Sequence, residues 1–209
     1  MINGIVSDLD GTLIDTAKTL ARAWEEAFKT EGLQVGYDEL YKNTKGIDSK
    51  DIIRKYKKEA KTEDLARIKE KRKDNFLNLI DSGSELLYPE TMKVLEEIRS
   101  RKIKIAIGTG MSRDLLGKVL AITGLDKNID AVVSSDDVEN GKPGPDIFLE
   151  AFDRIKVDPK NGIVVGDSDN DMLPGKEIGA FTVFISRDGL RSRVADADIT
   201  SLEEILRFL

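Results

Sequence analysis

The amino-acid sequence predicts an α/β protein, in which a doubly wound parallel sheet is interrupted by one helical insertion. Short runs rich in isoleucine and valine alternate along most of the chain with amphipathic stretches of helical period, which is the pattern of parallel βαβ units. Between residues 16 and 84 this alternation stops. The chain has 209 residues, of which 40% are hydrophobic, enough for one core domain with a smaller insertion.

Five apolar runs are predicted to form the sheet. They lack the polar alternation of strands with one face in water, as expected for strands that helices cover on both faces. The runs are Ile2–Ser7, Ile103–Ile107, Ala131–Val133, Ile163–Val165 and Phe181–Ile185. The helices expected between them are Thr91–Arg101, Arg113–Thr123, Ile147–Ile155 and Asn170–Ile178.

The segment from residue 16 to residue 84 is predicted to be helical throughout. Its apolar residues recur at helical spacing, for example at Leu20, Trp24 and Phe28, and again at Phe76 and Ile80. An insertion that follows the first strand would lie over the carboxyl end of that strand, where open α/β sheets bind their ligands.

Composition excludes several classes of site. The chain has no cysteine and no histidine, so it has no thiolate nucleophile, no Ser-His-Asp triad and no Cys- or His-based zinc site. With 33 basic and 39 acidic residues the net charge is −6, which argues against binding to nucleic acid or to anionic membranes. Because no signal peptide and no membrane-spanning run are recognisable, we expect a cytoplasmic protein.

Four aspartates are predicted to meet at the carboxyl edge of the sheet. Asp8 and Asp10 follow the first strand directly, and Asp167 and Asp171 follow the fourth. Residues i and i+2 at a strand end point to the same side, so the first two carboxylates can converge on one ligand. Carboxylates packed this closely repel one another and require a cation, and a site of oxygen ligands alone indicates Mg²⁺.

Phosphate-binding groups are predicted at the same edge. The second strand ends at Thr109 and Gly110, which offer a hydroxyl and exposed amides at a helix start. A simple helix N-cap is the alternative role for Thr109. Lys142 lies in the stiff loop Gly141-Lys-Pro-Gly-Pro145, where a fixed ammonium can neutralise an aspartate nucleophile and a transferring phosphoryl group.

These residues, in this order, resemble the four motifs of the haloacid dehalogenase-like superfamily. The matching motifs are Asp8-x-Asp10-Gly11-Thr12, Thr109, Lys142-Pro143 and Gly166-Asp167-x-x-x-Asp171. The insertion resembles the cap of the phosphoglycolate phosphatase and β-phosphoglucomutase-like branch. The resemblance covers essentially the whole chain. It implies a Rossmannoid catalytic core of residues 1–15 and 85–209, a helical-bundle cap of residues 16–84, and Mg²⁺-dependent phosphoryl transfer through an aspartyl-phosphate.

The resemblance also implies a role for each matching residue. Asp8 matches the nucleophile and Asp10 the general acid and base, while Thr109 and Lys142 match the phosphate-binding positions. The implied metal ligands are Asp8, Asp10 through its main-chain carbonyl, and Asp167, with Asp171 in a supporting acidic position. Gly110 stands where many relatives have asparagine.

The resemblance favours a phosphatase of small phosphate monoesters, with phosphoglycolate as the first candidate. Mutases of the β-phosphoglucomutase kind use a cap histidine that this chain lacks, and haloacid dehalogenases proper lack the second acid, Asp10. A phosphomutase and a non-catalytic metabolite-binding protein remain as alternatives. We expect the protein to be a monomer or a homodimer.

The implied cap would select the substrate. The loop from Lys45 to Lys50 lies between two expected helices, and Lys45, Gly46, Ser49 and Lys50 are the candidate specificity residues. The two lysines would bind a second anionic group such as a carboxylate. The alternative is that they are ordinary surface lysines.

Overall fold

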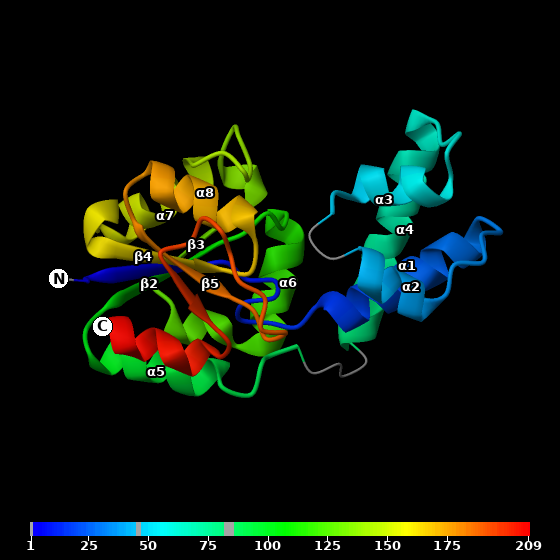
Figure 1. Cartoon of the computed structure of the whole chain (residues 1–209). Helices are drawn as coiled ribbons and strands as arrows, with labels where there is room; N and C mark the ends of the chain where they lie inside the picture. The colour runs from blue at the N-terminus through cyan, green and yellow to red at the C-terminus, as the bar shows by residue number, and fades with distance from the viewer. Residues whose placement is uncertain (1, 45–46, 82–85) are drawn as a thin grey trace. The chain divides into compact units, whose positions relative to one another are not determined.

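The computed structural model describes residues 2–44, 47–81 and 86–209, which divide into two compact units (Figure 1). One unit consists of Met1–Ile14 and Leu87–Leu209, and the other is the segment Asp15–Leu86. No helix within the described ranges is long and apolar enough to cross a membrane.

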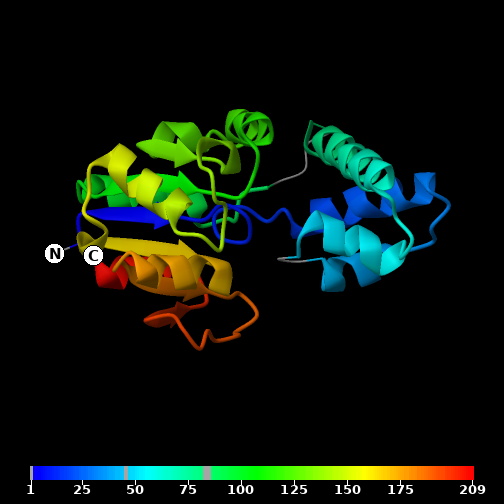
Figure 2. The ribbon, with the colours of Figure 1, turned by 90° about the horizontal axis from the view of Figure 1, so that it is seen from above.

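The first unit is built on a parallel sheet of six strands in the order β3-β2-β1-β4-β5-β6. The strands are β1 (Gly4–Ser7), β2 (Lys104–Gly108), β3 (Ala131–Val133), β4 (Gly162–Gly166), β5 (Phe181–Ile185) and β6 (Ala197–Ile199). In Figure 2 their arrows point the same way, with β1 in blue near the middle of the sheet. The α/β fold class predicted from the sequence is therefore confirmed.

The sequence prediction missed strand β6. It is short and forms one edge of the sheet beside β5, and Asp198 interrupts its apolar character. Edge strands are buried on fewer sides than central strands, so their sequences carry a weaker apolar signal. In the structure the Asp198 carboxylate accepts a hydrogen bond from the Ser192 amide at 2.9 Å, so this acid has a polar partner at the edge of the sheet.

Helices cover both faces of the sheet. Helix α7 (Asp146–Ile155) packs on β1, β2 and β3, and α8 (Asp169–Glu177) packs on β4 and β5. In Figure 1 these two helices lie above the sheet, while α5 (Thr91–Ser100) lies below it beside the 3₁₀-helix η4 (Leu202–Phe208). Helix α6 (Arg113–Thr123) follows β2. All four of these α-helices were predicted within about one residue of their observed ends, and the apolar faces of α5 and α7 are the clearest signals among them.

Close packing between helix and sheet depends on a glycine at the start of β4. Gly162 is buried, and a Cβ atom placed there would overlap the ring of Phe152, which α7 buries in the core. Gly162 therefore allows α7 to lie flat against the sheet.

The second unit is helical in the part that is described. Its helices are α1 (Ala17–Thr30), α2 (Tyr37–Asn43), α3 (Ser49–Tyr56) and α4 (Thr62–Asp81). Their apolar faces form a separate core around Trp24 and Phe28, whose rings stack with centroids 5.3 Å apart.

The ends of the second unit lie side by side. The Asp15 amide donates to the Leu86 carbonyl at 2.7 Å. In the first unit, Ile14 and Leu87 form an antiparallel bridge. The chain therefore leaves the sheet-containing unit and returns to it through adjacent residues.

We expect Gly162→Ala to lower the free energy of unfolding by about 1–3 kcal/mol, because the added methyl group must displace the Phe152 ring from a packed core. Urea unfolding followed by circular dichroism measures the change. Gly117→Ala is the matched control. Gly117 is exposed within α6 and has open space around its Cα, so alanine there should stabilise the protein by about 0.5–1 kcal/mol through helix propensity. Equal effects of the two substitutions would contradict the packing argument.

Candidate active site

A tight turn follows β1 and carries the first two aspartates. The Leu9 carbonyl accepts hydrogen bonds from the amides of Leu13 and Ile14 at 3.0 and 3.1 Å, and the Gly11 amide donates to the Ile14 carbonyl at 2.8 Å. Gly11 has φ +80°, and a Cβ atom there would overlap the carboxylate of Asp167. The glycine thus provides both the left-handed backbone of the turn and the space for an acid from β4 to approach it.

Lys142 bridges two of the predicted aspartates. Its Nζ donates to Asp8 Oδ1 at 2.5 Å and to Asp171 Oδ1 at 2.7 Å. The side chains of all three residues are at most 11% exposed. The ammonium also lies 4.8 Å from the centre of the Phe148 ring, a cation–π contact from α7. This buried ion triplet joins the loop after β3 to the ends of β1 and β4.

The Asp171 carboxylate is engaged at both oxygens. While Oδ1 accepts from Lys142, Oδ2 accepts from the amide of Ser168 at 3.2 Å and from its hydroxyl at 2.7 Å. These bonds form the capping box at the start of α8. The capping box holds the Asp171 carboxylate in place, and this carboxylate in turn holds Lys142.

Burial and charge act on the site in opposite directions. Burial raises the pKa of the Asp8 carboxyl well above its usual range; Lys142 lowers it, and the charges of Asp171 and Asp10 raise it again. Burial alone would lower the pKa of Lys142, but the carboxylates of Asp8 and Asp171 outweigh it and raise that pKa above its usual range. The lysine therefore stays charged, and any further positive charge near Asp8 would favour its ionised form.

Asp8, Asp167 and Asp171 form a set that fits a divalent cation. Each offers one carboxylate oxygen, and these oxygens lie within 4.8 Å of one another. Among the described residues, the set does not include the carboxylate of Asp10. The donors are all oxygen, which suits a hard cation, and such a cation would lessen the repulsion among these carboxylates.

Thr109 begins the loop between β2 and α6. It is buried, its amide donates to the Val133 carbonyl at 3.0 Å, and its Oγ1 accepts from the Met111 amide at 3.1 Å. The N-cap alternative is therefore wrong, because the N-cap of α6 is Ser112. Gly110 is exposed beside Thr109.

A sequence model of a protein family, the haloacid dehalogenase-like hydrolases, matches residues 5–185 of this chain. That span contains all four motifs and most of the chain. The chain belongs to this family.

Relatives and solved structures agree with this assignment. A phosphoglycolate phosphatase from Aquifex aeolicus is 28% identical over 207 residues, which are 98% of this chain and 95% of that protein. A pyrophosphatase PpaX from Halalkalibacterium halodurans is 29% identical, covering 98% and 95% of the two chains. A crystal structure of a hydrolase from Pseudomonas syringae has a TM-score of 0.79 at 26% identity, covering 98% and 96%. A β-phosphoglucomutase from Clostridium difficile has the same fold, with a TM-score of 0.79 at 23% identity, covering 98% and 93%.

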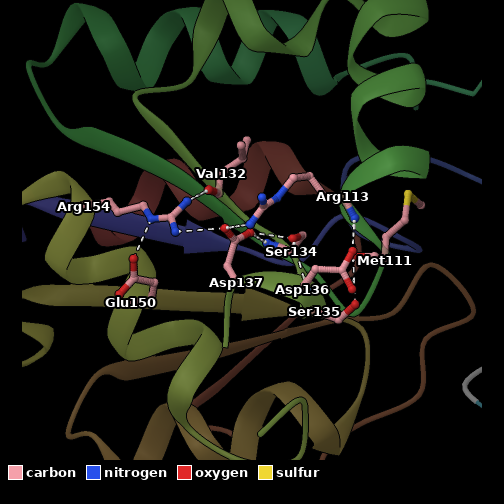
Figure 3. A network of polar contacts seen from close by, with 9 residues as sticks. All are labelled: Met111, Arg113, Val132, Ser134, Ser135, Asp136, Asp137, Glu150 and Arg154. Carbon is pink, nitrogen blue, oxygen red and sulfur yellow. Dashed lines mark hydrogen bonds and ion pairs between the residues drawn. The ribbon is translucent and has the colours of Figure 1, made fainter. Parts of the chain in front are cut away.

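In this haloacid dehalogenase-like hydrolase, hydrogen bonds join Met111 and Arg113, which follow β2, to residues that follow β3 (Figure 3). A short 3₁₀ turn, η2 (Ser135–Asp137), follows β3. The Ser135 amide donates to the Met111 carbonyl at 3.1 Å, and the Arg113 amide donates to Asp136 Oδ2 at 2.8 Å. Asp136 thus satisfies the first amide of α6, which the Ser112 side chain leaves without a cap.

Asp137 is the centre of the same network. Its Oδ1 receives Arg113 Nη2 at 2.8 Å and Arg154 Nη2 at 3.1 Å, and its Oδ2 accepts from the Ser134 amide at 2.8 Å (Figure 3). Burial opposes the Asp137 charge, but the Ser134 hydrogen bonds and Arg154 outweigh it and hold the pKa of that carboxyl well below its usual range. Arg154 also donates to the Val132 carbonyl. The sequence analysis missed this network. The two consecutive acids begin three residues after a predicted strand, and nothing in the sequence identifies their partners.

The candidate specificity residues are only partly placed. Lys45 and Gly46 lie outside the described residues. Ser49 is half-buried at the first position of α3, and Lys50 is exposed. The Lys50 amide donates to the N-cap Asp48 at 2.8 Å, so the main chain of this residue serves the helix start.

We expect a divalent cation such as Mg²⁺ to stabilise the protein, and we expect Asp167→Asn to remove that stabilisation. A cation bound only by the folded state adds about 2.7 kcal/mol at about 100 times its Kd, and the variant loses one of the set's carboxylates. Thermal unfolding in EDTA and in Mg²⁺ measures this difference. The measurement in EDTA gives the effect of the substitution itself, which is subtracted from the comparison in Mg²⁺. Asp153→Asn, at a 73% exposed side chain on α7, is the control and should behave as wild type. A full Mg²⁺ response in Asp167→Asn would exclude this carboxylate as a ligand.

Proposed function

We propose that this hydrolase is a Mg²⁺-dependent phosphatase that hydrolyses a small phosphate monoester through an aspartyl-phosphate at Asp8. The observation that carries the proposal is the buried contact of Asp8 Oδ1 with Lys142 Nζ, made beside further carboxylates that suit a cation. A nucleophilic carboxylate that must approach an anionic phosphoryl group requires positive charge at both partners.

In the proposed first step, an Asp8 carboxylate oxygen attacks phosphorus as the ester oxygen leaves on the opposite side. Asp10 protonates that leaving oxygen, which departs as an alcohol. Asp10 then removes a proton from water, and the water oxygen attacks the phosphorus of the aspartyl-phosphate, which releases inorganic phosphate and restores Asp8. Lys142 holds Asp8 in position and offsets the charge on the phosphoryl oxygens.

Mg²⁺, when bound, neutralises Asp8 and the phosphoryl oxygens. Asp8 and Asp167 would hold it through their carboxylates, and Asp10 through its main-chain carbonyl. Because Asp171 is bonded to Lys142 and Ser168, its proposed part is to support the site and orient the lysine. Thr109 and Gly110 would hold the remaining phosphate oxygens through a hydroxyl and an exposed amide.

Phosphoglycolate is the first substrate candidate, because the Aquifex aeolicus relative is named for that activity. Pyrophosphate is the second, because several relatives of similar identity are named pyrophosphatase PpaX. The proposed enzyme acts without nucleic acid or membrane, in the cytoplasm, as a monomer or homodimer. Residues 16–84 would form the cap that selects the leaving group, and Ser49 and Lys50 remain candidates there.

Inorganic phosphate release from a panel of phosphate monoesters and pyrophosphate, with Mg²⁺ and with EDTA, tests the proposal. Release with Mg²⁺ that EDTA abolishes would support it. A phosphomutase would instead convert a sugar phosphate to its isomer without releasing phosphate. A metabolite-binding protein would turn over neither substrate class.

We expect Asp8→Asn to abolish turnover while the protein keeps its fold, because an amide does not form the acyl-phosphate. Steady-state phosphate release, together with the circular dichroism spectrum, measures both. The substitution also replaces one of the two carboxylates bonded to Lys142, and the bond from Lys142 to Asp171 remains. Substantial activity in the folded variant would refute the covalent mechanism.

Asp10→Asn should slow hydrolysis of an alkyl phosphate by about 10²–10⁴-fold, because the leaving alcohol is then unprotonated. The loss should be much smaller for an aryl phosphate, whose leaving group is stable as an anion. Comparison of kcat for the two esters gives the ratio. Equal losses on both esters would contradict the acid role of Asp10.

A further inference from the structure

Arg187 reaches the turn that carries Asp10. It lies two residues beyond the end of β5, at the carboxyl edge of the sheet. Its Nη1 donates to the Gly11 carbonyl at 2.9 Å, and its Nη2 donates to the Thr12 carbonyl at 3.2 Å. These are the main-chain carbonyls of the two residues that follow Asp10.

The guanidinium is itself held in place on two further sides. Arg187 Nη2 pairs with Glu90 Oε1 at 2.8 Å, and its central carbon lies 3.3 Å from the centre of the Tyr88 ring. The side chain is 24% exposed. A planar group that is stacked and paired in this way has little freedom to rotate, so it acts as a fixed donor to the turn.

The turn needs such an external donor. The hydrogen bonds within the turn are accepted by the carbonyls of Leu9 and Ile14. The carbonyls of Gly11 and Thr12 instead accept hydrogen bonds from Arg187. Strand β4 lies between β1 and β5, so the sheet does not join the turn to β5 directly. A long, forked side chain at the end of β5 spans that strand and fixes the two peptide planes that follow Asp10.

We propose that Arg187 is the positioning residue for the general acid Asp10, and that it orients the Asp10 carboxylate toward the leaving oxygen by fixing the peptides of Gly11 and Thr12. This inference rests on the proposed phosphatase function. The contacts of Arg187 described above are with Gly11, Thr12, Glu90 and Tyr88, whereas the phosphate-binding candidates Thr109 and Lys142 lie on the loops after β2 and β3. Its effect is therefore on leaving-group protonation and not on phosphate binding.

The test compares Arg187→Met with wild type on an alkyl and an aryl phosphate. Methionine keeps much of the length but donates no hydrogen bond. Because small displacements of a catalytic group are costly, kcat for the alkyl ester should fall about tenfold or more. For the aryl ester, kcat should fall no more than about threefold, since its leaving group needs little protonation. Competitive inhibition by inorganic phosphate should stay within about twofold of wild type, because phosphate binding lies elsewhere.

Arg101→Met is the matched control. Arg101 also donates to a main-chain carbonyl, that of Leu206, and pairs with Glu97, but it lies between α5 and β2 at the amino edge of the sheet. Its loss should leave both kcat values unchanged. Arg187→Lys keeps a charge for Glu90 but lacks the fork that reaches two carbonyls, so it should show the same selective loss as methionine. It also replaces Arg187→Met in the test if that variant does not fold.

The outcomes separate the two proposals. A selective loss on the alkyl ester in a folded Arg187 variant supports the positioning role. If wild type is active and the variant loses activity equally on both esters, or loses phosphate affinity instead, the inference is overturned while the phosphatase proposal stands. Full activity of Arg187→Lys on the alkyl ester also overturns it. If wild type releases no phosphate from either ester, the proposed function is wrong and the inference falls with it.

Discussion

A buried ammonium between two carboxylates is the interaction on which this site depends. Lys142 partly offsets the repulsion between Asp8 and Asp171, and it does so at the meeting point of three segments that are far apart in the chain. Asp167 and Asp10 add to the negative charge near Asp8, so the acids of the site outnumber its one ammonium. A divalent cation would offset much of that excess. Lys142 and a cation would therefore both be needed to offset the repulsion among these carboxylates.

The parallel register of the sheet makes this meeting possible. Ser7, the last residue of β1, pairs with Ile107 of β2 on one side and with Val165 of β4 on the other, so these neighbouring strands end within one residue of one another. The loops that follow them emerge at one edge. Each loop is then fixed by a different device: a glycine turn after β1, an acid network after β3 and a capping box after β4. The supports of the site therefore come from separate parts of the chain and meet at one edge of the sheet.

The sequence was sufficient for the features that repeat or that cluster in motifs. Ile- and Val-rich runs marked the five more apolar strands, and acids at strand ends marked the residues that the fold gathers around Lys142. It was insufficient for β6, whose central residue is Asp198, and for single residues such as Asp136 and Arg187. These side chains bond to main-chain groups more than 20 residues away in the sequence. Every residue except proline has the same main-chain amide and carbonyl, so the amino-acid sequence does not indicate which of them will be the partner. Such contacts follow from the fold and not from local composition.

The side-by-side ends of the helical unit have a consequence for how this chain can vary. Asp15 is hydrogen-bonded to Leu86, and Ile14 forms a bridge with Leu87. The two points at which the segment joins the sheet-containing unit are therefore adjacent, and their spacing does not depend on the length of the segment. The cost of closing a loop grows only slowly with its length. Replacement of the segment by a longer, shorter or unrelated helical module should therefore leave the sheet's connectivity intact. If the segment selects the substrate, as proposed above, a new substrate can be acquired by changes within it while the residues at the sheet edge are inherited unchanged.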